Sequence, residues 1–71
     1  MPMSADIELA TYRIRKAEII VLRQRKILLQ MTRRGDPTGM AEDLLESYER
    51  ILSDYRTHLT RLLSKEPPDP F

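Results

Sequence analysis

The stretch Arg33-Arg34-Gly35-Asp36-Pro37-Thr38 decides the fold, because it divides the chain into two long helix-patterned segments of similar length. Gly35 can adopt the left-handed backbone conformation that ends a helix. Pro37 cannot continue a helix but can begin one, and it holds Asp36 in the extended conformation of an N-cap residue. The stretch therefore predicts a very short turn at residues 35–37 between two antiparallel helices.

The first predicted helix extends from about residue 4 to residue 34, with Ser4 as its N-cap and with Asp6 and Glu8 in its first turn. Apolar residues recur along it at alternating steps of three and four, which is the spacing of coiled coils. We call this line of residues the seam of the first helix. It contains Ile7, Ala10, Ile14, Ala17, Val21, Gln24, Leu28 and Met31.

Apolar residues also flank this seam. Ile20 and Ile27 lie on one flank, and Leu22 and Leu29 lie on the other. Together with the seam they cover an arc of roughly 220°, about twice what one antiparallel neighbour needs. Since a second helix can cover the seam and one flank, we expect the other flank to meet a second copy of the chain. The predicted fold is all-α: an antiparallel two-helix hairpin that pairs into a homodimeric four-helix bundle.

The second predicted helix extends from about residue 38 to residue 64 and has a seam of the same spacing. That seam contains Ala41, Leu45, Tyr48, Leu52, Tyr55, Leu59 and Leu62, with Leu44, Ile51 and His58 alongside it at seven-residue intervals. The proline-rich tail, residues 65–71, is predicted to be disordered.

The predicted dimer or interaction interface combines the flanks of the first helix with large side chains of the second. Tyrosine buries a wide ring and keeps a hydroxyl group that needs a partner, and the single histidine lies within an apolar stripe. The predicted interface residues are Ile20, Leu22, Ile27, Leu29, Tyr48, Tyr55 and His58.

Charge is divided between the halves of the chain. Residues 1–35 carry eight basic and three acidic side chains, a net charge of +5, whereas residues 36–71 carry four and eight, a net charge of −4. We expect Arg33 and Arg34 near Glu42 and Asp43, and the group Arg23, Arg25 and Lys26 across from Glu46 and Glu49. This division favours the antiparallel arrangement.

A basic stripe also follows the first helix, and it has two interpretations. Its residues are Lys16, Arg23, Lys26 and Arg33. They form either a solvated helix face, which we favour, or a phosphate-binding face for nucleic acid. The sequence contains no recognition-helix turn, glycine-rich phosphate loop or aromatic stacking platform to support nucleic-acid binding.

Composition excludes several classes of function. The 71 residues allow one domain, and with no cysteine there is no disulfide to stabilise so small a core, so association is the expected stabiliser. One histidine, His58, provides neither a metal site nor a catalytic set, so we expect no enzyme, metal or cofactor. The longest apolar run, Ile19-Ile20-Val21-Leu22, is far short of the roughly 20 residues that span a bilayer, and no signal peptide is visible. A soluble cytoplasmic protein without a membrane partner is expected.

Parts of both segments resemble short uncharacterised bacterial helical-hairpin proteins. The residues that carry the resemblance are Glu18-Ile19-Ile20-Val21-Leu22-Arg23-Gln24-Arg25, Gly35-Asp36, Ala41-Glu42-Asp43-Leu44-Leu45 and His58-Leu59. The resemblance covers about residues 12 to 62 and implies a helical hairpin, with no assigned activity. Pro37 departs from the pattern, which has a threonine or another small polar residue there.

We therefore predict a small non-enzymatic structural or interaction protein that self-associates through an apolar helical face. A helix of another protein is an alternative occupant of that face. A small nucleic-acid-associated regulator that uses the basic stripe is the alternative function.

Overall fold

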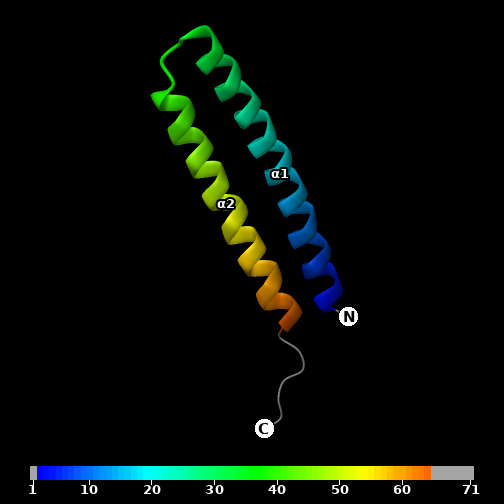
Figure 1. The fold of residues 1–71 in the computed structure, drawn as a ribbon. Coiled ribbons are helices and arrows are strands. Elements are labelled where there is room, and N and C mark those ends of the chain that lie inside the picture. The colour runs from blue at the N-terminus through cyan, green and yellow to red at the C-terminus, as the bar shows by residue number, and fades with distance from the viewer. Residues whose placement is uncertain (1, 65–71) are drawn as a thin grey trace.

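The computed structural model describes residues 2–64, and it describes side chains from Ala5 onward. Within that range the chain is all-helical: α1 is Pro2–Arg34 and α2 is Gly39–Ser64, and the two helices pack side by side and antiparallel (Figure 1). The hairpin measures 59 × 20 × 12 Å, so it is two helices wide and one helix thick. The predicted tail, residues 65–71, lies outside the described residues.

The start of α1 corrects the predicted N-cap. α1 begins at Pro2, so Ser4 lies inside the helix and does not cap it. Proline suits the first helical position because its φ is already helical and its missing N–H would have no partner there. The first turn contains no acidic residue, so Asp6 and Glu8 lie beyond the position at which they were expected to favour the helix dipole.

The end of α1 is closed by a Schellman motif at Gly35. Gly35 has a φ of +77°, which is the left-handed value expected of it. Its backbone N–H donates to the carbonyl of Thr32 at 3.1 Å, and the N–H of Asp36 donates to the carbonyl of Met31 at 2.9 Å. These two hydrogen bonds satisfy carbonyl groups that have no partner inside the helix.

The start of α2 corrects the predicted role of Asp36. α2 begins at Gly39, so Thr38 is its N-cap and Pro37 precedes the helix. The Thr38 carbonyl accepts the N–H of Glu42 at 2.8 Å, and the Thr38 hydroxyl donates to the Glu42 carboxylate at 2.9 Å. Asp36 instead approaches Arg34, with 3.9 Å between the carboxylate and guanidinium groups. Threonine takes the cap because the chain continues extended through Pro37 before α2 starts.

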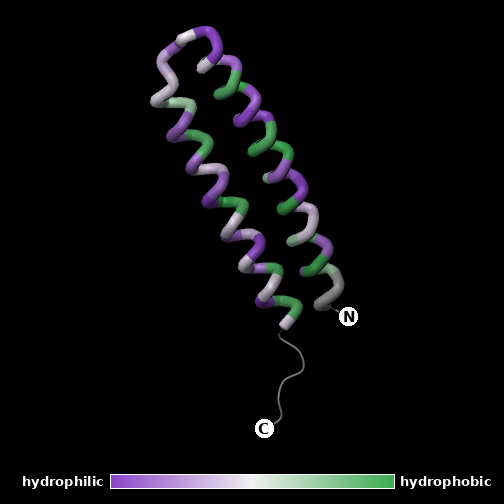
Figure 2. Tube along the Cα trace, in the orientation of Figure 1, coloured by the Kyte–Doolittle hydropathy of each residue, from purple (hydrophilic) through white to green (hydrophobic). Residues whose placement is uncertain are grey.

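The seams of α1 and α2 face each other, and every residue of both seams is buried or half-buried. Hydrophobic residues recur along both helices (Figure 2). The most deeply buried are Ala10, Ala17, Val21, Ala41 and Leu52, at 2–7% exposure. Three of these five are alanines, which allow close approach but bury little apolar area. No side chain of the described residues is less than 2% exposed, because a hairpin one helix thick cannot enclose one.

Candidate interaction surface

One edge of the hairpin is closed by ion pairs, and we call Glu18, Arg25, Glu49 and Arg56 the charged edge. The Arg25 guanidinium donates to Glu49 at 3.0 Å, and the Arg56 guanidinium donates to Glu18 at 3.1 Å. Each pair joins α1 to α2, and the two pairs lie seven residues apart on each helix. The arginine comes from α1 in one pair and from α2 in the other. Because the four side chains are 43–59% exposed, each pair contributes only about 0–1 kcal/mol.

The other edge carries aliphatic side chains in place of charges, and we call Ile20, Ile27, Leu44 and Ile51 the apolar edge. Ile20 and Ile51 line the same groove between the helices, and Ile27 and Leu44 lie one heptad closer to the turn. The four side chains are 36–46% exposed. The hairpin therefore leaves an apolar stripe from both helices open to solvent on this edge.

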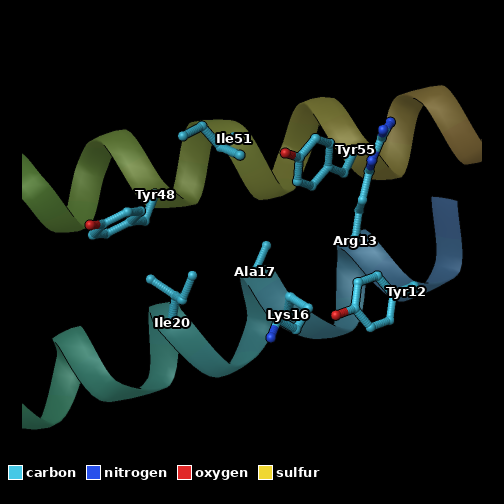
Figure 3. Close-up of a pocket in the computed structure, with 8 residues that line it drawn as sticks. All are labelled: Tyr12, Arg13, Lys16, Ala17, Ile20, Tyr48, Ile51 and Tyr55. Carbon is cyan, nitrogen blue, oxygen red and sulfur yellow. The ribbon is translucent and has the colours of Figure 1, made fainter. Parts of the chain in front are cut away.

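The groove on the apolar edge has a volume of about 330 Å³ and is centred on Ala17 (Figure 3). Ala17 leaves this space because its side chain is a single methyl group. Tyr48 and Tyr55 line the groove from α2 and also pack against the buried core of Ala17, Val21 and Leu52. Three exposed residues of α1, Tyr12, Arg13 and Lys16, complete its lining. The Lys16 ammonium lies 5.7 Å from the centre of the Tyr12 ring, within the range of a cation–π interaction.

The structure separates the residues predicted to form one interface. Ile20 and Tyr48 line the groove on the apolar edge, whereas Leu22 lies on the charged side, in a hollow with Glu18 and Arg56. Seven residues further along α1, Ile27 lies on the same side as Ile20, and Leu29 lies on the same side as Leu22. Tyr55 lines the groove, and His58 is exposed, seven residues beyond Ile51 on α2.

The expectation that α2 covers one flank of α1 is wrong. Ile20 and Ile27 are 36% and 43% exposed, and Leu22 and Leu29 are 59% and 49% exposed, so both flanks remain open. Two antiparallel helices meet along one seam, and the side chains on either side of that seam point past the neighbouring helix rather than onto it.

Leu44 and Ile51 were not among the predicted interface residues, although they form half of the apolar edge. Their signal was the seven-residue spacing on α2 that matches the spacing of Ile20 and Ile27 on α1. The Glu18–Arg56 ion pair was also missed. The sequence could have predicted this pair, because Glu18 lies seven residues before Arg25 and Arg56 lies seven residues after Glu49, which keeps them opposite each other in antiparallel helices.

The basic stripe is accessible along its whole length. Its four residues, Lys16, Arg23, Lys26 and Arg33, are all exposed, and within residues 5–64 none of them forms an ion pair. Lys16 differs from the others because it lines the groove. Arg33 and Arg34 were expected near Glu42 and Asp43, but Arg34 pairs with Asp36 instead.

Among residues 2–64 there is no cluster of three or more histidine, cysteine or acidic side chains that could hold a metal ion. No helix in that range is both long and apolar enough to cross a membrane.

The sequence matches no protein-family model, and searches of curated proteins and of solved structures found no similar protein. The resemblance to bacterial helical-hairpin proteins therefore stays a prediction.

Proposed function

We propose that this protein is a small, non-enzymatic interaction module that self-associates through its apolar edge. The observation that carries the proposal is the imbalance between buried and exposed apolar residues. Among residues 5–64, five hydrophobic residues are buried, three of them alanines, whereas eleven large hydrophobic side chains are at least 36% exposed. A chain with so little enclosed core gains most by burying further apolar surface against another molecule.

A second copy is the simplest occupant, because α1 and α2 contribute equally to the apolar edge. Ile20 and Ile27 come from α1, and Leu44 and Ile51 come from α2. A surface built in this way can meet itself about a twofold axis, and the association then closes at a dimer. The product is the four-helix bundle predicted from the width of the apolar arc.

Sedimentation equilibrium of the whole chain, with circular dichroism on the same samples, tests the proposal. At about 50 µM we expect helical protein with twice the 8.4 kDa mass of the chain. A helical protein of monomer mass would contradict self-association and would favour a helix of another protein as the occupant.

The alternative function, a nucleic-acid-associated regulator, would use the accessible basic stripe. Phosphate binding through such a stripe must weaken steeply with salt, because bound counterions are released. We expect a titration with mixed-sequence duplex DNA or RNA to give no saturable complex. A tight complex that weakens with salt, and that is lost when Arg23 and Lys26 are replaced by glutamine, would favour the regulator.

A further inference from the structure

Charged side chains lie beside the apolar edge on both helices. Arg23 follows Ile20 by three residues on α1, and Asp54 follows Ile51 by three residues on α2, so each charge lies on the same side of its helix as the aliphatic residue. Lys16 lies on the same side of α1 and lines the groove. All three charged side chains are exposed, and within residues 5–64 none of them forms an ion pair. The flank is therefore basic on α1 and acidic at Asp54 on α2.

The ion pairs of the charged edge define the register between the helices. Because Glu18 pairs with Arg56 and Arg25 pairs with Glu49, residues of α2 between 49 and 56 lie level with residues of α1 between 18 and 25. Asp54 consequently lies at a height along the hairpin between those of Lys16 and Arg23. If α2 of a second copy packs beside α1 at the same height, its Asp54 therefore lies between Lys16 and Arg23.

A second copy can cover the apolar edge in two symmetric ways. In the first, the twofold axis is parallel to the helices, α1 of each copy packs on α2 of the other, and both turns lie at the same end. In the second, the axis is perpendicular to the helices, like helices pack together, and the turns lie at opposite ends. Both arrangements bury the four aliphatic side chains, so the hydrophobic effect alone does not choose between them.

The charges distinguish the two arrangements. With the turns at opposite ends and the apolar edges centred on each other, Arg23 of one copy comes near Arg23 of the other, because Arg23 lies close to the middle of the edge, three residues from Ile20 and four from Ile27. With the turns at the same end, Asp54 of one copy lies between Lys16 and Arg23 of the other. The net charges of the two halves of the chain, +5 and −4, favour the same arrangement.

We propose, resting on the self-association proposed above, that two copies pack with their turns at the same end. α1 of each copy lies against α2 of the other, and Asp54 of each copy is held between Lys16 and Arg23 of the other. The aliphatic residues drive association, and the charged flanks select the orientation.

Charge reversal tests the proposed contact. Asp54→Lys should weaken dimerisation by roughly tenfold at low salt, because each dimer contains the contact twice and attraction becomes repulsion, and by less at high salt. Adding Lys16→Glu and Arg23→Glu to the same chain should restore the dimer. An Asp54→Lys dimer as tight as the parent would contradict the contact.

Distance measurement between spin labels tests the orientation directly. The chain contains no cysteine, so Ser64→Cys places one label per copy at the open end, and Asp36→Cys places one at the turn. Neighbouring helix axes in a bundle are about 10 Å apart, so turns at the same end predict label separations below about 30 Å at both positions. Because α2 alone is about 39 Å long, turns at opposite ends predict about 45 Å or more at Ser64. Long distances in a protein of dimer mass would overturn the orientation and leave self-association standing, whereas monomer mass would overturn both.

Discussion

On the charged edge, two arginines reach across to glutamates of the other helix at 3.0 and 3.1 Å, whereas on the apolar edge four aliphatic side chains remain 36–46% exposed. The two edges flank the same seam, and both are built from residues at seven-residue spacing on both helices. They differ in whether their interactions can form within a single hairpin. Ion pairs on the charged edge are already formed and need no further molecule, whereas the apolar edge gains free energy only when another surface covers it.

The largest expected effect comes from placing a charge on the apolar edge. Ile27→Glu should weaken dimerisation by about 1–3 kcal/mol, because Ile27 is 43% exposed in the hairpin and each of the two copies per dimer loses somewhat less than half of the roughly 1.5–3 kcal/mol of full burial. Leu22→Glu is the matched control, since Leu22 is an exposed aliphatic residue of the same helix on the charged side. We expect Leu22→Glu to remain a dimer, as sedimentation equilibrium can check.

Equal loss of association in Ile27→Glu and Leu22→Glu would contradict the distinction between the two sides of the hairpin. It would restore the single wide interface that the sequence alone predicted.

A smaller effect comes from the turn, on which both edges depend equally. Gly35→Val should destabilise the folded protein by about 1 kcal/mol or more, since a β-branched residue resists positive φ. Apart from Gly35 and its two chain neighbours, nothing lies within 4 Å of a Cβ built at Gly35, so the cost comes from the backbone and not from a clash.

Gly39→Ala is the control for the turn, because Gly39 begins α2, has equally open surroundings and is not held at a positive φ. It should leave stability unchanged or raise it by up to about 1 kcal/mol. Thermal melts of Gly35→Val that coincide with those of the parent would contradict the strain assigned to this turn.

The smallest effect is expected on the charged edge. A double-mutant cycle with Arg25→Gln and Glu49→Gln should give a coupling free energy of about 0.2–1 kcal/mol that decreases with added salt. Denaturant unfolding of the four proteins measures it. A coupling above about 2 kcal/mol, unchanged by salt, would show that the charged edge stabilises the protein as much as the apolar edge does.

The hairpin could be predicted from the sequence because its signals are local. Gly35 and Pro37 restrict the backbone whatever packs around them, and the three-four spacing defines both seams. The N-cap of α2 was assigned to Asp36 instead of Thr38 because both are good N-cap residues, and their positions beside Pro37 do not decide between them.

The candidate interface could be predicted only in part. The apolar arc on α1 was visible in the sequence, but the side that α2 would leave open depends on how α1 is rotated about its own axis in the packed pair. That rotation is set by the contact of Ala17 and Val21 with Leu52. It places Leu22 on the side of the charged edge and Ile27 on the apolar edge, although both were predicted to belong to one interface.

The central claim is that folding and association of this hairpin are one equilibrium. Thermal unfolding at two protein concentrations tests it most directly. The loss of helical circular dichroism should be recorded at about 5 µM and at about 500 µM of the whole chain. If the apolar edge is completed by a second copy, the midpoint temperature must rise with concentration, because dimerisation stabilises the folded state by mass action. Superimposable melting curves at the two concentrations would show that the hairpin is stable alone, and would contradict the account.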